Sequence, residues 1–243
     1  MKKTLLAGVV LCATSVPAFA DDGIKGCTLA GILPAVEAAL NQVVVGGNGG
    51  IFSPNMMWAA VVDRNGVLCG TAKVGDAWPG SRAIAIAKAE TANDFSNDKL
   101  ALSTANLYAA TQPGGSLYGL NNSNPFNPFF NAITTDNSLG LARGNGVGLN
   151  PGGIITFGGG VALYNQSNEV IGGLGVSGDT ACADHAIAYT MRVLLGLNHI
   201  PAGVGLNGTD NILYAPAGTT PAGFQHPHCG ASDIVPTDSA VSQ

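Results

Sequence analysis

Two pairs of apolar segments, each joined by a short polar turn, limit the fold of this chain more than any other feature. Residues 57–62 and 67–73 form the first pair, with Asp63-Arg64-Asn65-Gly66 between them. Because Asn-Gly accepts the positive φ angles of a tight turn, this pattern predicts a β-hairpin. Residues 160–164 and 169–176 repeat the pattern. The two predicted hairpins indicate an antiparallel sheet.

Four predicted helices accompany the hairpins. Residues 29–44 and 80–95 place apolar side chains on one helical face, and the small side chains of the second helix imply close packing. A shorter helix is predicted over residues 99–110, and Asp179-Thr180 predicts the cap of a helix over residues 181–195. Two hairpins with helices on one side of their sheet indicate an α+β domain.

The glycine-rich segments at the strands do not match a phosphate-binding loop. Gly158-Gly159-Gly160 and Gly172-Gly173 lie at predicted strands, whereas a phosphate loop lies between a strand and a helix. Close strand packing or β-bulges explain these glycines better. The sequence also lacks a Walker loop and the HExxH, GxSxG and paired CxxC motifs.

Residues 1–20 have the pattern of a cleavable secretory signal. Lys2 and Lys3 precede an uncharged run over residues 4–16, and Ala18-Phe19-Ala20 has small residues where a signal peptidase cleaves. The apolar run is too short to span a membrane, and no later segment reaches that length. We therefore predict cleavage near Ala20 and a periplasmic or secreted protein that begins near Asp21.

Removal of the signal leaves an acidic chain. Two of the ten Lys and Arg residues lie in the signal, so 8 basic residues remain against 15 acidic ones, a net charge of −7. Nucleic acids and anionic membranes attract basic surfaces, so neither is expected as a partner. Only 10% of the residues are charged. Such a low surface charge favours a homo-oligomer, in which subunit contacts cover part of the surface.

Four cysteines remain after removal of the signal, because Cys12 lies within it. An even number in an oxidising compartment favours two disulfides, and three pairings are open. The alternatives are buried thiols or a metal site, but no ligand-like spacing supports a metal. His226 and His228 flank Pro227 and could bind a metal, although a disulfide-anchored tail explains them better. The disulfide candidates are Cys27, Cys69, Cys182 and Cys229.

Residues 21–243 are predicted to form a single domain, because no change in composition marks a boundary. Residues 112–153 form a long loop rich in Asn, Pro and Gly, and such loops are usually functional, flexible or engaged in subunit contacts. The tail over residues 198–243 is rich in Gly and Pro. We expect Cys229 to tie this tail to the domain.

The first candidate site lies where the strand ending in Ser177-Gly178 meets the next helix. Asp184 and His185 lie near the first turn of that helix, and Tyr189 lies one turn beyond His185. Free backbone N–H groups at the helix start favour a ligand there. His185 could ligate iron, act as a base or bind a carboxylate. The alternative is a capped helix in which His185 is an ordinary half-buried side chain.

The second candidate site is the strand-to-helix transition over residues 76–82. Trp78 lies close to Arg82 there, and an aromatic ring beside a guanidinium suits a flat or anionic ligand. Lys88 lies further along the same helix, and Tyr118 in the long loop could line the same cleft. The alternative is that Trp78 only packs against Pro79.

The order and spacing of five fragments resemble the GlcG/HbpS-like family, whose members are described as haem-degrading or haem-binding. The fragments fall within residues 57–195, and Asp184 follows the last of them. They are AAVVDRNG at 59–66, GDA at 75–77, IAIAKAETA at 84–92, GGGVA at 158–162 and VIGGLGVSGD at 170–179.

This resemblance implies a profilin-like α+β domain, an antiparallel sheet of about five strands with helices packed against it. It also implies extracytoplasmic binding of haem or another tetrapyrrole, with or without iron binding, and assembly into a homo-oligomer. The chain departs from the usual short form of the family in its insertion at 112–153 and in its cysteine-bearing tail. Both could reshape or cover the family's pocket.

The leading hypothesis is an exported haem-binding protein that is non-catalytic or weakly haem-degrading. Haem requires an apolar slot, an axial ligand and cationic groups near its propionates. His185 or Tyr118 is the candidate axial ligand, with His185 as the metal ligand. Arg82 or Lys88 would lie near the propionates, and Trp78 against the ring.

Two other hypotheses remain open at this point. The chain could be a small-molecule enzyme of the tautomerase, lyase or isomerase type, in which Asp184 and His185 transfer protons and Arg82 holds a carboxylate. It could also be a non-catalytic assembly protein whose loops contact other subunits. No set of residues in the sequence demands a reaction, which favours binding over catalysis.

Overall fold

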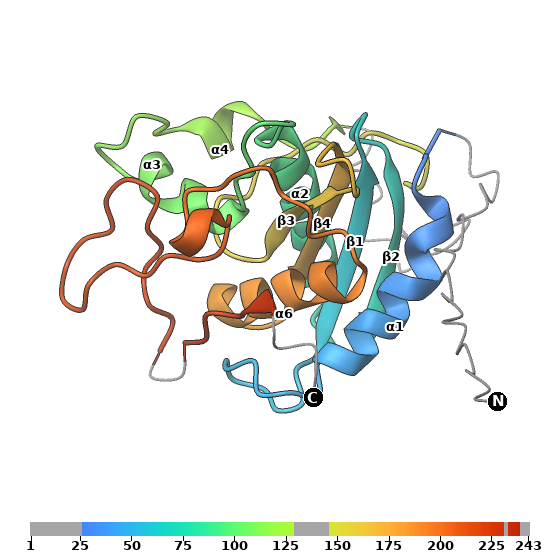
Figure 1. The fold of residues 1–243 in the computed structure, drawn as a ribbon, viewed down its shortest axis with the longest axis horizontal. Helices are drawn as coiled ribbons and strands as arrows, with labels where there is room; N and C mark the ends of the chain where they lie inside the picture. The colour runs from blue at the N-terminus through green and yellow to red at the C-terminus, as the bar shows by residue number, and fades with distance from the viewer. Residues whose placement is uncertain (1–25, 129–145, 231–232, 239–243) are drawn as a thin grey trace, which may run out of the picture.

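The computed structural model describes residues 26–128, 146–230 and 233–238, with a four-stranded antiparallel sheet at the centre (Figure 1). The strands are β1 (Met57–Asp63), β2 (Leu68–Val74), β3 (Gly160–Tyr164) and β4 (Val170–Ser177). Their order is β2-β1-β4-β3, so β1 and β4 join the two hairpins. The antiparallel sheet is confirmed, with four strands in the described residues instead of about five.

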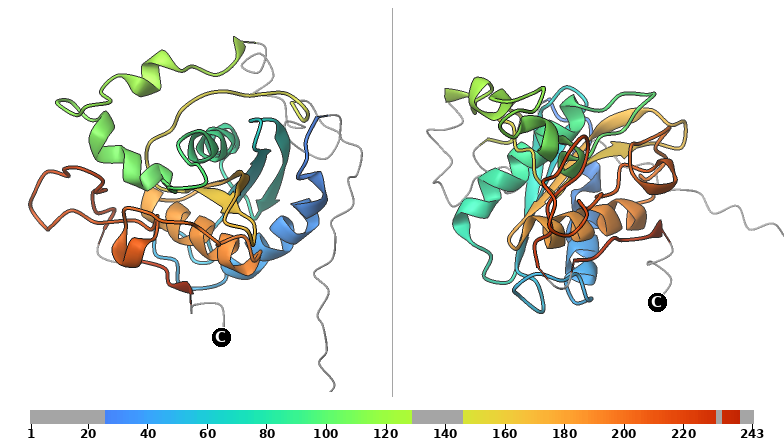
Figure 2. Two further views of the ribbon diagram at one scale, coloured as in Figure 1. Left: turned by 45° about the horizontal axis from the view of Figure 1, so that its top comes forward. Right: turned by 90° about the vertical axis from the view of Figure 1, so that its left-hand side faces the viewer.

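Helices cover both faces of this sheet (Figure 2). The helices α1 (Leu33–Val43) and α6 (Ala181–Leu194) lie on one face, and α2 (Pro79–Asp94) lies on the other. A short 3₁₀ turn, Ala30–Ile32, precedes α1. The α+β class is confirmed, but the prediction that the helices lie on one side was wrong.

The composition of β1 explains why both faces are covered. Ala59 and Val61 pack in the cluster that includes α1 and α6, whereas Trp58, Ala60 and Val62 pack against α2. Every residue of β1 is buried. A strand that is covered on both faces is apolar throughout instead of alternating, and this unbroken apolar run was the signal in the sequence.

Glycines in β4 allow α2 to approach the sheet closely. A Cβ atom at Gly173 would collide with the carbonyl oxygen of Ala89, and one at Gly175 with that of Ala85. Both carbonyls belong to α2, whose small side chains leave its backbone accessible. The close packing against a sheet that was predicted for this helix is therefore confirmed.

The predicted helix over residues 99–110 is only partly present. A 3₁₀ turn, Thr104–Leu107, continues into α3 (Tyr108–Thr111), but the preceding residues are not helical. The side-chain oxygen of Asn97 accepts hydrogen bonds from the backbone N–H groups of Lys99 and Leu100. Such a local turn competes with helix formation, and the helical segment begins only after Ser103.

The insertion and the tail lie on the outside of this core. The described part of the insertion includes the short helix α4 (Leu120–Ser123), whereas residues 129–145 and the predicted signal at 1–20 lie outside the described residues. The tail contains the 3₁₀ turn Leu206–Gly208 and runs across α6 (Figures 1 and 2). Asp210 in the tail forms a buried two-bond ion pair with Arg192 of α6, at 2.6 and 2.7 Å.

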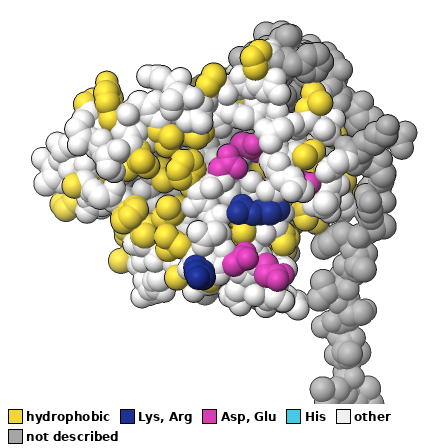
Figure 3. All heavy atoms as spheres, turned by 90° about the horizontal axis from the view of Figure 1, so that it is seen from above, with side chains coloured by type: hydrophobic (Ala, Val, Ile, Leu, Met, Phe, Trp, Pro, Cys, Tyr) yellow, Lys and Arg dark blue, Asp and Glu magenta, His cyan; other side chains and the backbone are white. Residues whose placement is uncertain are grey.

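Both predicted disulfides are present, and their pairing is Cys27–Cys69 and Cys182–Cys229. The second one ties the tail to the first turn of α6, as expected for Cys229. Within the described ranges, no helix has the length and hydropathy that a membrane crossing requires. Figure 3 shows one face of the molecule, on which few side chains are charged and hydrophobic ones gather on the left.

Candidate functional site

A buried ion pair connects α2 to α6. Lys88 Nζ lies 2.6 Å from Asp184 Oδ2 and donates a second hydrogen bond to the carbonyl oxygen of Val176, at 3.1 Å. The backbone of Gly159 passes beside the pair, and a Cβ atom there would lie 2.7 Å from Lys88 Nζ. The Phe157 ring lies 4.8 Å from the same nitrogen. The pair therefore occupies a closed space that a larger residue at 159 would fill.

The second carboxylate oxygen of Asp184 anchors the loop before α6. Asp184 Oδ1 accepts a hydrogen bond from the backbone N–H of Asp179, at 3.0 Å. The Asp179 carboxylate in turn accepts from the N–H groups of Ile51 and Phe52, at 2.8 and 3.0 Å. Thr180 caps α6 through the N–H of Ala183, as predicted from the sequence. Asp184 thus has partners for both oxygens.

Burial changes the pKa values of both partners in opposite directions. It lowers the pKa of Lys88, although the Asp184 carboxylate opposes this shift. It raises the pKa of Asp184 to about 6, and Lys88 opposes that shift. A buried pair is favourable only while both partners are present, because removal of one leaves an uncompensated buried charge. The chemistry of the pair is therefore to hold α2 and α6 together.

His185 is fully buried beneath the tail. Its Nε2 atom lies 3.1 Å from Asn211 Oδ1. The backbone N–H of Ile212 points at both acceptors, at 3.1 Å from Nε2 and at 2.8 Å from Oδ1. Asn211 Nδ2 donates to the carbonyl oxygen of Pro236, at 2.6 Å, which turns Oδ1 towards His185. We assign the shorter bond of the Ile212 N–H, to Asn211 Oδ1, as the one that forms, so that His185 Nε2 carries the proton and donates to the same oxygen. This assignment leaves a lone pair on Nδ1, which has no hydrogen-bond partner among the described residues.

His185 carries no charge at neutral pH. Burial lowers its pKa to about 4, although the Asp210 carboxylate and the Asn211 hydrogen bond partly oppose this shift. A neutral imidazole held through one nitrogen, with a lone pair on the other, is the form in which histidine binds metals.

A second buried histidine, His226, approaches the same region from the tail. Its Nδ1 atom lies 2.7 Å from the carbonyl oxygen of Pro227, which can only accept, so Nδ1 carries the proton. Nε2 then accepts from the N–H of Gly158, at 3.3 Å. Burial lowers the pKa of His226 to about 4. Gly158 also approaches His185, since a Cβ atom at 158 would lie 3.0 Å from the Cβ of His185.

Two predicted residues of the second candidate site, Trp78 and Arg82, lie beside Trp58 in a separate group. Trp78 is 52% exposed and makes an edge-to-face contact with Phe52, whereas Arg82 is buried with its guanidinium 5.2 Å from the Trp58 ring. Tyr118 is 68% exposed and lies in the insertion. The structure therefore pairs Lys88 with Asp184, gives the neighbouring His185 partners from the tail, and places Trp78 and Arg82 in another group. The ligand roles of all six residues stay predictions.

The larger of two described cavities lies outside both groups. It has a volume of about 520 Å³ and lies between the end of α1, the glycine-rich loop that follows it, the outer face of α6 and the tail. Among the described residues that line it, none is charged and none is His, Cys, Met or Tyr. The lining residues are Gln42, Val43, Val45, Gly46, Gly47, Asn48, Ala186, Thr190, Leu194, Ile234 and Pro236.

Sequence reasoning missed the contributions of Asn211 and this cavity, and it considered His226 only as a possible metal ligand in the tail. Each depends on the path of the tail across α6, which local patterns do not reveal. The one available signal was the run His226-Pro227-His228-Cys229, in which a cysteine expected to form a disulfide carries histidines beside it.

A family model described as "Haem degrading protein HbpS-like" matches residues 54–191. The chain belongs to the HbpS-like family. The matched segment contains the whole sheet, α2 and most of α6, and therefore Lys88, Asp184 and His185. The helix α1 and the tail, with Asn211 and His226, lie outside the match.

Three solved structures align with the chain, and the first of them shows the same fold. The Klebsiella pneumoniae protein ORFY aligns with a TM-score of 0.50 and 24% identity, covering 75% of this chain and 98% of that one. PduOC, solved as a complex with haem, aligns with a TM-score of 0.46 and 25% identity over 68% of this chain and 95% of that one. A double mutant of Streptomyces reticuli HbpS has a TM-score of 0.41 and 18% identity, covering 75% of this chain and 98% of that one. No curated protein sequence matches the chain significantly.

Proposed function

We propose that this HbpS-like protein is exported and binds haem or a related tetrapyrrole without needing to catalyse a reaction. The observation that carries the proposal is His185, a buried neutral imidazole within the segment that matches the family model. A histidine is among the usual axial ligands of haem iron. Bound haem would supply an iron centre, and the chain would supply the ligand and its surroundings.

The donor chemistry of His185 fits this ligand. Its Nδ1 lone pair has no hydrogen-bond partner among the described residues, while Asn211 holds the ring through Nε2. Ligating histidines commonly use their second nitrogen in this way, because it fixes the tautomer and the orientation of the ring. In contrast, the cavity of about 520 Å³ has no such donor among its described lining residues, so it does not fit an iron-ligated haem by itself.

Access to His185 requires movement of the tail. Asn211 and Ile212 cover the imidazole, and the Arg192–Asp210 pair holds the adjoining tail residues against α6. The tail lies outside the segment that matches the family model. We therefore propose a gated form of haem binding, in which the described arrangement is the covered state of the ligand. Trp78, Arg82, Lys88 and Tyr118 remain predicted contacts for the ring and its propionates.

The partners of Asp184 favour binding over proton transfer. Its two oxygens interact with Lys88 and with the N–H of Asp179, so neither is directed at an open cleft. A general base must reach the proton of its substrate within hydrogen-bonding distance. Asp184 is also buried, so this carboxylate argues against the tautomerase, lyase or isomerase alternative.

Export and self-association are parts of the same proposal. The signal pattern in residues 1–20 and the formation of two disulfides support export, because disulfides persist in oxidising compartments. The low content of charged side chains, also visible on the face in Figure 3, supports a homo-oligomer. Detection of the chain in a periplasmic or medium fraction, and light scattering, test these two parts.

A haemin titration of the mature protein tests the ligand. We expect the Soret band of haemin to shift when the wild type is added. His185→Ala should not produce this shifted band. His199→Ala is the matched control, because His199 is an exposed histidine whose removal should leave the spectrum unchanged. Circular dichroism confirms that the variants are folded. The absence of any Soret shift in the wild type would reject haem binding, and an unchanged spectrum in His185→Ala would reject this ligand.

A further inference from the structure

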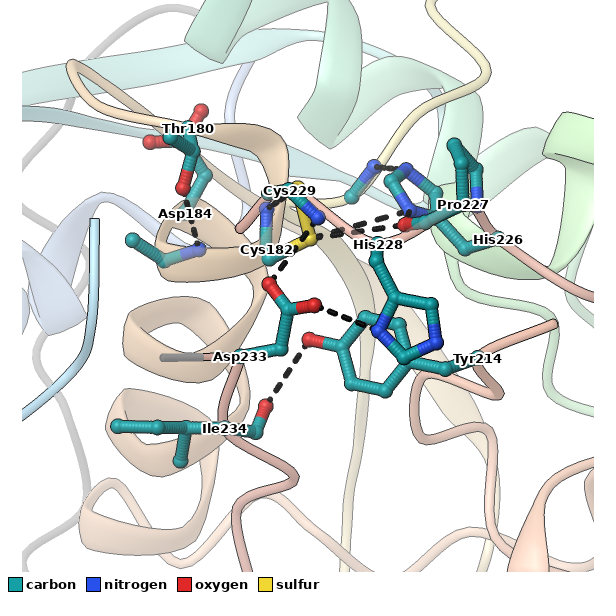
Figure 4. The surroundings of a disulfide bond; sticks show 12 residues. Thr180, Cys182, Asp184, Tyr214, His226, Pro227, His228, Cys229, Asp233 and Ile234 are labelled. Atoms are coloured by element: carbon teal, nitrogen blue, oxygen red, sulfur yellow. Dashed lines mark hydrogen bonds and ion pairs between the residues drawn. A yellow bond between two sulfur atoms is a disulfide. The ribbon is translucent and has the colours of Figure 1, made fainter. Parts of the chain in front are cut away.

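The tail disulfide lies within a cluster of metal-ligating side chains (Figure 4). Cys182 lies in the first turn of α6, whereas His226 and Cys229 lie in the tail. Their ligand atoms all lie within 4.8 Å of one another, and Cys182 Sγ lies 4.0 Å from His226 Nδ1. Cys182 and His226 are buried, and Cys229 is partly buried. In the oxidised chain the two sulfur atoms are bonded to each other and cannot act as thiolate ligands.

We propose that reduction of the Cys182–Cys229 disulfide creates a Zn²⁺ site formed by Cys182, Cys229 and His226. A dithiol reductant would supply two electrons and two protons, forming two thiols while its own sulfur atoms join in a disulfide. Zn²⁺ would then bind both sulfur atoms as thiolates and release their two protons. Water would complete the four ligands that zinc prefers.

The distances require only small movements of the ligand atoms towards zinc geometry. Zinc binds sulfur at about 2.3 Å and nitrogen at about 2.0–2.1 Å, so two tetrahedral S and N ligands lie roughly 3.6 Å apart. The observed distance from Cys182 Sγ to His226 Nδ1 is 4.0 Å. The sulfur atoms must separate to roughly 3.8 Å for the same geometry, which cleavage of their bond permits.

Two backbone features favour the thiolate forms of these cysteines. The N–H of Cys182 points at Cys229 Sγ, at 3.1 Å, and could stabilise a negative charge on that sulfur. Cys182 itself lies in the N-terminal turn of α6, where the helix dipole favours an anion. The thiolate is the form in which cysteine binds a metal, so both features assist zinc binding.

The present tautomer of His226 opposes zinc binding, because Nδ1 carries the proton. Nδ1 now donates to the carbonyl oxygen of Pro227, and Nε2 accepts from the N–H of Gly158. Ligation through Nδ1 transfers the proton to Nε2, so the ring must turn away from the N–H of Gly158. No net proton is released by the histidine in this exchange. The zinc would tie the tail to α6 in place of the disulfide.

The other disulfide provides a matched control within the same chain. Cys27–Cys69 lies in the apolar cluster with α1, and no histidine, cysteine or carboxylate completes a three-ligand group around it in the described parts of the chain. Reduction of this disulfide exposes two thiols of the same kind but without an adjacent imidazole. Zinc binding should therefore distinguish the two pairs.

The test is an anaerobic zinc titration of the mature protein, before and after reduction with dithiothreitol and its removal by gel filtration. A chromophoric chelator reports the bound metal. We expect one Zn²⁺ per chain in the reduced wild type and in the reduced C27S/C69S variant, and none in the oxidised wild type. His226→Ala should bind at least roughly tenfold more weakly, since even the loss of a partner beyond the ligands costs that much.

Two results would overturn the proposal. One is a reduced wild type that binds no more zinc than the oxidised form. The other is a reduced C182S/C229S variant that binds zinc as tightly as the wild type. Substitution of Co²⁺ for zinc provides an independent reading, because intense thiolate-to-cobalt absorption should appear in the wild type and be absent in C182S/C229S. These results do not depend on haem binding.

Discussion

The two disulfides close loops of similar length in surroundings that differ sharply. Cys27 and Cys69 are separated by 42 residues, and Cys182 and Cys229 by 47. Loops of these lengths lose similar chain entropy on cross-linking, worth about 4 kcal/mol each. The first disulfide lies in the large apolar cluster with α1, whereas the second lies in a smaller apolar cluster beside the buried His226. The helix α6 that carries Cys182 also carries the buried Asp184, His185 and Arg192. Any difference between the effects of removing the two disulfides must therefore come from the residues around them.

This comparison defines two regions that are stabilised by different kinds of interaction. The apolar region around Cys27–Cys69 depends on burial of side chains that need no specific partner. The polar region beneath the tail depends on matched partners, because each unpaired charge there would be buried. Function is expected in the polar region, since it contains the neutral histidines and the one disulfide with ligand atoms around it.

The largest expected effect is on the Arg192–Asp210 pair of the polar region. Arg192→Met leaves the Asp210 carboxylate buried without its partner, which should lower the free energy of unfolding by about 3–5 kcal/mol. The double variant Arg192→Met/Asp210→Leu should recover most of this loss, because no charge remains buried. Urea unfolding monitored by circular dichroism measures both. A single variant as stable as the wild type, or a double variant no better than the single one, would contradict the description of this region.

Removal of each disulfide should have the next largest effect. C27S/C69S and C182S/C229S should each lose about 4 kcal/mol of unfolding free energy through the longer free loop. C27S/C69S should lose more than C182S/C229S, because it buries both hydroxyl groups in the large apolar cluster, whereas Cys229 is only partly buried in a smaller one. In C182S/C229S, hydrogen exchange should increase mainly in the tail. An equal loss in both variants, with exchange raised throughout α1 in each, would remove the distinction between the regions.

The smallest expected effect is on the pH dependence of stability. The pKa of His185 is lowered to about 4 in the folded chain, so the unfolded chain binds more protons between that value and about 6.5. The stability from its neutral form is complete above the unfolded pKa and is lost as the pH falls towards 4. Unfolding free energies at several pH values should show a weaker acid dependence in His185→Ala than in the wild type. C27S/C69S should keep the wild-type acid dependence of stability. A weaker dependence in C27S/C69S, with an unchanged one in His185→Ala, would contradict the assignment of this dependence to His185.

Local patterns predicted much of the fold. The Asn65-Gly66 turn, the apolar runs and the Asp179-Thr180 cap each act over a few residues, so the hairpins and the three main helices were predicted with nearly correct bounds. The local turn made by Asn97 was overlooked, and the helix predicted from residue 99 was too long. The faces covered by the helices depend on contacts between distant segments. The only local signal for them was the unbroken apolar run over residues 57–62 in β1.

The candidate site was predicted residue by residue but not as an arrangement. Lys88 was assigned to one site, and Asp184 and His185 to another, because α2 and α6 are far apart in the sequence. The structure joins Lys88 to Asp184 across the start of β3, where Gly159 leaves space for the amino group. Asn211 could not be connected to His185 from the sequence, since irregular segments such as the tail have no periodic pattern to place them.

The rate of haemin binding in the two disulfide variants tests the central claim most directly, namely that His185 binds haem once the tail moves. Stopped-flow absorbance at the Soret band should show faster binding in oxidised C182S/C229S than in the wild type, because the tail is no longer tied to α6. C27S/C69S should bind at the wild-type rate, and His185→Ala added to C182S/C229S should abolish the shifted band. Equal rates in both disulfide variants, or a band that survives without His185, would contradict the account.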